Sequence, residues 1–276
     1  MKYIKLFTFD CKNGILRNTF LWLAAIILPV AICIDIGYRL HVDGESIRSF
    51  ADYLMAAYGG MKAYKPLPEE PFIFPVVWIV LMLSPAYATL KYPLHDIQSF
   101  GQQVLYRSKG RLIWWLSKCS WNVLSTLLYH SIVISLLALG VFTLGSHFTQ
   151  DMNEVFLRSL FDVKEEIALV TPLLLSTKLI VVPIMISVAL NLLQMMLSLF
   201  VKPVCSFLVI LVMIISSSYL LSPYLLGNYA MILRSDTIWI NGVNFHHGLL
   251  LAVLLILFAV IIGAIRFKRY DIMGKE

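Results

Sequence analysis

Apolar residues gather in six long runs, which are separated by stretches rich in polar and charged residues. The runs cover residues 18–36, 72–90, 119–144, 173–200, 204–226 and 248–265. Each run offers about the 20 apolar residues that an α-helix needs to cross the hydrocarbon core of a bilayer. The pattern therefore predicts an all-α, polytopic membrane protein with six transmembrane helices, forming a single domain over residues 1–276.

Composition supports this prediction. Of the 276 residues, 59% are hydrophobic and only 14% are charged, whereas a soluble domain carries about 25% charged residues. The net charge of +6 does not indicate a nucleic-acid partner, because the cations stand at the ends of apolar runs. The four cysteines follow no metal-ligand spacing, which favours apolar packing over a metal or disulfide role.

The distribution of cations predicts the orientation. With six spans both termini lie on one side, and that side holds fourteen of the 22 Lys and Arg residues, against seven on the other side and Lys178 within the fourth span. The positive-inside rule then places both termini in the cytoplasm. Residues 1–17 space Ile4, Phe7, Cys11 and Ile15 as one helix face, which predicts a short amphipathic helix on the inner membrane surface.

The stretch 91–118 is a polar interruption with a strong excess of cations. Five Lys and Arg residues stand there against a single acid, Asp96. The charge count makes it a cytoplasmic loop, and we interpret it as the segment that contacts a partner protein. Residues 266–276 form a second cytoplasmic segment, a tail that is basic at its start.

Motifs for chemistry are scarce. The sequence has no HExxH or GxSxG motif for catalysis and no GxxxxGK[ST] loop for ATP, so we expect no catalytic residue, no metal site and no cofactor bound by the chain itself. His246 and His247 lack further ligands at a suitable spacing. Asn191, Gln194 and Met195 in the fourth span are candidates for a substrate path. The alternative explanation of the two amides is a pair of hydrogen bonds between helices.

Without buried ionic groups evident in the spans and without a nucleotide motif, energy for any transport has to come from a separate subunit. In layout the chain resembles the membrane subunits of type-2 ABC exporters, a group that includes small bacterial drug, peptide and lantibiotic-immunity permeases. The resemblance rests on six spans with both ends inside, on the amphipathic leader, on GQQVLYRSKGRLIWWLSK (101–118) and on the basic-aromatic ending RFKRYDI (266–272).

This resemblance implies two ABC ATPase subunits that bind ATP and Mg²⁺, and a second copy or a paralogue of the permease, in the bacterial cytoplasmic membrane. It implies a coupling helix between spans two and three that docks on the ATPase. The docking residues would be His95, Asp96, Gln98, Phe100, Gln102 and Gln103.

The remainder of the loop would face the lipid bilayer. Arg107, Lys109 and Arg111 would lie near lipid phosphates, and Trp114 and Trp115 would anchor the third span at the interface. The alternative function is a membrane scaffold or sensor that binds partners without transporting anything.

Overall fold

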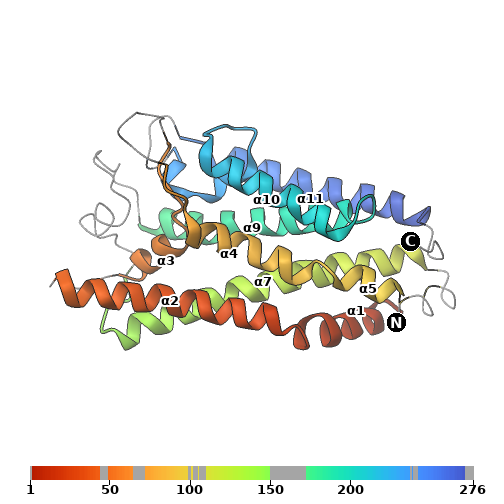
Figure 1. Cartoon of the computed structure of the whole chain (residues 1–276), viewed down its shortest axis with the longest axis horizontal. Helices are drawn as coiled ribbons and strands as arrows, with labels where there is room; N and C mark the ends of the chain where they lie inside the picture. The colour runs from red at the N-terminus through yellow and green to blue at the C-terminus, as the bar shows by residue number, and fades with distance from the viewer. Residues whose placement is uncertain are drawn as a thin grey trace.

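The computed structural model describes residues 2–43, 49–64, 72–98, 101, 105, 110–149, 172–236, 238 and 242–270. Within these residues the fold is all-helical and has no strands. Its long helices run side by side along one axis (Figure 1). They are α2 (Thr19–Asp43), α4 (Val76–Thr89), α7 (Arg111–Thr143), α9 (Pro172–Leu197), α10 (Pro203–Tyr219) and α11 (Phe245–Lys268).

Five helical segments of the described chain are long and apolar enough to cross a membrane. They are Thr19–Val42, Val76–Gln98, Arg111–Thr143, Lys178–Leu197 and Phe245–Lys268. Helix α10 is apolar but has only 17 residues, or about 26 Å at 1.5 Å per residue. The chain thus has the construction of a multi-pass α-helical membrane protein, and five of the predicted spans meet the length criterion.

The two ends of the bundle differ in what they carry. At one end lie α1 (Lys2–Cys11), α5 (Tyr92–Gln98) and the last turn of α11 (Figure 1). We call this the α1 end. At the opposite end lie α3 (Phe50–Tyr58) and the short 3₁₀ turns η2 (Leu226–Ala230) and η3 (Ile232–Arg234), and we call this the α3 end. Both termini therefore lead to the same end of the bundle.

Helix α3 lies in a region that the apolar pattern leaves as a loop. Its first turn is closed by a capping box, in which the Asp52 backbone N–H donates to Ser49 Oγ (3.3 Å) and the Ser49 N–H donates to Asp52 Oδ2 (3.0 Å). Seven of its nine residues are buried. The Tyr58 hydroxyl lies 3.0 Å from His130 Nδ1, so α3 packs inside the bundle against the middle of α7.

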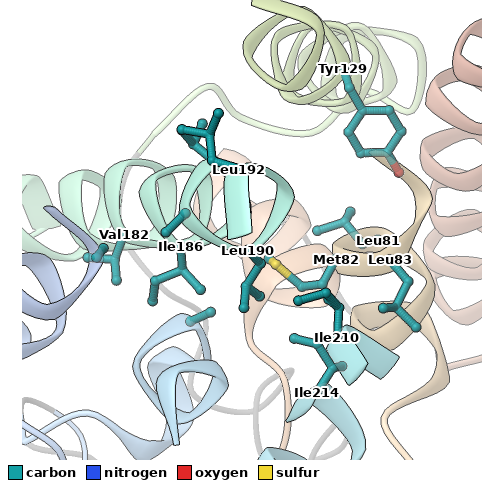
Figure 2. Close-up of a cluster of buried hydrophobic side chains, with 14 of the residues drawn as sticks. Leu81, Met82, Leu83, Tyr129, Val182, Ile186, Leu190, Leu192, Ile210 and Ile214 are labelled. Atoms are coloured by element: carbon teal, nitrogen blue, oxygen red, sulfur yellow. The ribbon is translucent and has the colours of Figure 1, made fainter. Parts of the chain in front are cut away.

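The apolar core forms where α4, α9 and α10 meet. Leu81 and Met82 of α4 face Leu190 of α9 and Ile210 and Ile214 of α10, all at most 2% exposed (Figure 2). By contrast, many large apolar side chains along α2 and α11 are exposed on the outside of the bundle. That distribution suits a protein whose outer surface meets hydrocarbon.

The turns between α10 and α11 close the α3 end. Arg234 is 1% exposed, and its guanidinium donates to the carbonyl oxygens of Ser217, Ser218 (2.6 Å) and Met61 (3.2 Å). The first two carbonyls belong to the last turn of α10, where a cation is favoured by the helix dipole. Burial lowers the pKa of Arg234 to about 10, so the group keeps its charge at neutral pH.

Candidate functional site: a buried ionic cluster at the α1 end

A buried cluster of ionic groups joins three helices at the α1 end. Lys118 of α7 bonds with its ammonium group to the carboxylates of Asp10 on α1 and Asp96 on α5, and the Nζ–Oδ2 distance to Asp96 is 2.7 Å. The Lys118 and Asp10 side chains are completely buried, and that of Asp96 is 4% exposed. We refer to these three residues as the ionic cluster.

Neighbouring side chains complete the hydrogen bonding of both carboxylates. Tyr92 donates its hydroxyl to Asp10 Oδ1 (2.9 Å), and Ser117 donates to Asp10 Oδ2 (2.6 Å). Trp114 donates its indole N–H to Asp96 Oδ2 (3.1 Å). A buried charge is tolerated only when it is paired and hydrogen-bonded in this way. These hydrogen bonds thus hold the side chains of the ionic cluster in fixed positions.

Aromatic rings surround the ammonium group on its remaining sides. Lys118 Nζ lies 4.5 Å from the ring centroid of Tyr92 and 4.9 Å from that of Trp114, within the range of cation–π attraction. Tyr92 also packs on Trp121, with ring centroids 4.6 Å apart, and Trp121 in turn packs on Gly14. These contacts surround the ammonium group with aromatic rings and pack α1 and the turn after it against α7.

Helix α5 has one face turned to the ionic cluster and one turned outward. Pro93, Asp96 and Ile97 are buried, whereas His95 and Gln98 are exposed at a spacing of three residues. The sequence predicts Asp96 as a docking residue, but its carboxylate is enclosed within the chain, so Asp96 positions α5 instead of facing a partner. The other predicted docking residues, Phe100, Gln102 and Gln103, lie outside the described residues.

The two tryptophans at the start of α7 are also buried, each at 1% exposure. Trp114 stacks on Phe267 with ring centroids 4.5 Å apart, and Trp115 donates its indole N–H to the Val260 carbonyl (2.9 Å). Helix α11 thus covers both rings, and the prediction that they anchor the span at the lipid interface stays a prediction. Gly263 makes this possible, since any Cβ there would collide with the Trp115 ring.

Arg111 is bonded to the end of α11. Its Nη1 donates to the carbonyls of Lys268 (2.7 Å) and Tyr270 (2.9 Å). The Lys268 carbonyl is an acceptor that a helix C-terminus leaves unpaired. The predicted contact of Arg111 with lipid phosphates stays a prediction. The same holds for Arg107 and Lys109, which lie outside the described residues.

The candidates for a substrate path face the interior of the chain. Asn191, Gln194 and Met195 are at most 4% exposed, and the Asn191 side-chain amide donates to Thr126 Oγ1 of α7 (2.7 Å). Asn191 thus makes an interhelical hydrogen bond, as one of the two interpretations of these amides predicts. A role on a substrate path stays a prediction.

Comparison with protein families gives one match. Residues 21–273 fit the model of a family described as a protein of unknown function (DUF2705). The chain belongs to this family. No curated protein and no solved structure matches the chain. In this DUF2705 member, the ionic cluster joins three separate helices at the α1 end through buried charges.

Sequence reasoning missed most of the ionic cluster. Asp10 lies in the predicted amphipathic helix of residues 1–17, and Lys118 is one of the cations of the predicted cytoplasmic loop. The available signal was that Asp10 and Asp96 are isolated acids within segments that are otherwise basic and are predicted to lie on the same side of the membrane. Isolated acids of this kind need cationic partners once they are buried.

Proposed function

We propose that this chain is the membrane-spanning permease subunit of an ATP-binding cassette exporter in the bacterial cytoplasmic membrane. It would move a peptide, an antibiotic or another amphipathic molecule, with energy from two ATPase subunits that bind ATP and Mg²⁺. A second copy or a paralogue of the chain would complete the transporter. In this proposal α10 is the fifth of six spans, and the α1 end faces the cytoplasm.

The observation that carries the proposal is the construction of α5. A short helix presents His95 and Gln98 outward at the α1 end, while its opposite face is bonded through Asp96 to Lys118 and thereby to α1. A force applied to α5 would be transmitted to α7 and α1 together, because the ionic cluster connects all three. A soluble motor that acts on a membrane bundle requires such a rigid connection between its docking surface and the spans.

Orientation and fold support the same assignment. Helices α1 and α5 and the last turn of α11 share one end, and the cation excess of the sequence falls on the segments at that end. The described residues contain no group of three His, Cys, Asp or Glu side chains arranged to hold a metal ion, and the sequence has no nucleotide-binding loop. The proposal accordingly assigns binding and transmission to this chain.

The test is co-purification with cassette ATPases encoded in the same genome, each co-expressed with the tagged chain and purified in a mild detergent. A double variant, His95→Ala with Gln98→Ala, removes the outward face of α5 without touching the ionic cluster. Lys202→Ala is the matched control, because Lys202 is an exposed polar residue in the α9–α10 turn. We expect one cassette ATPase to bind the wild type and the control, and to lose at least tenfold in yield with the double variant.

Two results would contradict the proposal. If no cassette ATPase binds the folded wild type, the exporter assignment fails. If a cassette ATPase binds but proteoliposomes show no ATP-dependent movement of any amphipathic dye or peptide tested, the chain is a scaffold or a sensor. Equal binding by the wild type and the double variant would refute the docking role of α5 alone.

A further inference from the structure

A row of polar side chains on α7 faces a row on α9 in the middle of the bundle. The polar residues of α7 are four positions apart, and those of α9 are three or four apart. Residues at this spacing lie on one face of a helix, so each row occupies a single face. All six side chains are at most 2% exposed. They are Asn122, Thr126 and His130 on α7, and Ser187, Asn191 and Gln194 on α9. We call them the polar seam.

One hydrogen bond fixes the register of the seam. Asn191 donates to Thr126 (2.7 Å), and α7 and α9 run in opposite directions (Figure 1). One turn from this bond toward the α1 end therefore brings Gln194 level with Asn122. One turn toward the α3 end brings Ser187 level with His130. Helix geometry therefore orders the six residues as three successive pairs by level along the α7–α9 contact, of which the Asn191–Thr126 pair is directly bonded.

The pairs have more hydrogen-bonding capacity than they use. Within the described residues, no protein partner lies in reach of Asn122 Nδ2 and Oδ1, Gln194 Oε1, Asn191 Oδ1, Ser187 Oγ or His130 Nε2. A buried polar group without a partner costs about 1–3 kcal/mol, and proteins normally hold only a few such groups per 100 residues. Six such atoms along one helix contact indicate a ligand that bonds to all of them.

The chemistry of the six atoms identifies that ligand. They include donors and acceptors, none of their groups carries a fixed charge, and the direct Asn191–Thr126 bond keeps the helices close together. A small neutral molecule that both donates and accepts satisfies these conditions, whereas a peptide, a lipid chain or an ion does not. We propose that the polar seam binds a file of internal water molecules.

The file would extend along α7 between the levels of Asn122 and His130. Lys118 of the ionic cluster lies one turn beyond Asn122 on α7, and His130 at the other end bonds through Nδ1 to the Tyr58 hydroxyl of α3 (3.0 Å). Buried waters that each make about three hydrogen bonds are a regular part of protein interiors. The seam is thus a hydrated column inside one chain, and it does not depend on the transport function proposed above.

Water-edited solid-state NMR of the chain in lipid bilayers tests this directly. With ¹⁵N-labelled asparagine, magnetisation passes from water to the side-chain amides that lie beside it. Asn122 and Asn191 report on the seam. Asn228 is the matched control, because it is fully buried but donates to the carbonyls of Leu220 (2.9 Å) and Ser222 (3.0 Å). Conservative Asn→Gln variants assign the three signals.

We expect the Asn122 and Asn191 amides to gain water magnetisation at least three times faster than the Asn228 amide. Asn122→Leu should slow the transfer to Asn191, because it removes two of the water-bonding atoms. Equal, slow transfer to all three amides would overturn the proposal. The decisive comparison uses the wild-type chain without any ATPase, so failure of the permease assignment leaves this test unaffected.

Discussion

Replacement of Lys118 by Met is the strongest test of the ionic cluster. The change keeps the length and the apolar stem of the side chain but leaves Asp10 and Asp96 without their common cation. Breaking a buried ion pair in this way costs about 3–5 kcal/mol, because an uncompensated charge stays buried. The loss of cation–π contacts with Tyr92 and Trp114 adds about 0.5–2 kcal/mol.

The expected result is a large loss of thermal stability. For a chain of this size 1 kcal/mol corresponds to a shift in Tm of about 2–4 °C, so the ion-pair term alone predicts a fall of about 6–20 °C. The measurement is a circular-dichroism melt of the purified protein in detergent. Lys202→Met is the control, since Lys202 is exposed and its replacement should shift Tm by no more than 2 °C or so.

A triple variant separates charge from shape. Lys118→Met combined with Asp10→Asn and Asp96→Asn removes all three charges. Each amide keeps one oxygen, which can accept from Trp114 at position 96 and from either Tyr92 or Ser117 at position 10. Because replacement of a whole buried ionic group by neutral residues is often close to neutral, the triple variant should melt above Lys118→Met. If Lys118→Met melts like the Lys202 control, or if the triple variant melts below the single one, the reasoning is refuted.

Three further predictions concern other contacts. Burial and the neighbouring Asp10 carboxylate both raise the pKa of the Cys11 thiol. Asp10→Asn should therefore shift the pH dependence of the rate of Cys11 labelling by iodoacetamide to lower pH. An unchanged pH dependence would exclude that carboxylate as a cause. Gly263→Leu should lower Tm by about 2–12 °C, because overpacking against Trp115 costs about 1–3 kcal/mol. Ile261→Phe on the exposed side of α11 should leave Tm nearly unchanged; equal shifts would contradict the packing. Arg234→Lys should lower Tm by a similar amount through lost carbonyl contacts, more than Arg39→Lys, whose guanidinium is partly exposed.

The spans were predictable because hydrocarbon imposes a length and a composition on each one. Five of the six apolar runs correspond to helices that are long enough to cross a membrane. Helix α3 was not predictable in this way, since nine residues are too few for a span and Asp52 makes the segment look like a surface loop. Its carboxylate instead bonds the Ser49 backbone within its own capping box.

The candidate site was predictable only in part. His95 and Gln98, which the resemblance implied as docking residues, are exposed on α5, whereas their docking role stays a prediction. The direction of Asp96 does not follow from charge and spacing, because pairing with Asp10 and Lys118 depends on how three helices pack. Trp114 and Trp115 show the same limit, since an aromatic pair at the start of a span suits the lipid interface and a helix contact equally well until α11 is in place.

The separation of Asp10 and Lys118 along the chain has a consequence for biogenesis. The two residues are 108 positions apart, and the N-terminal part of a protein is made first. When α1 leaves the ribosome, the cation that neutralises Asp10 has not yet been synthesised. Helix α1 therefore cannot take up its final position until α7 has been made, and the α1 end is completed only after that helix.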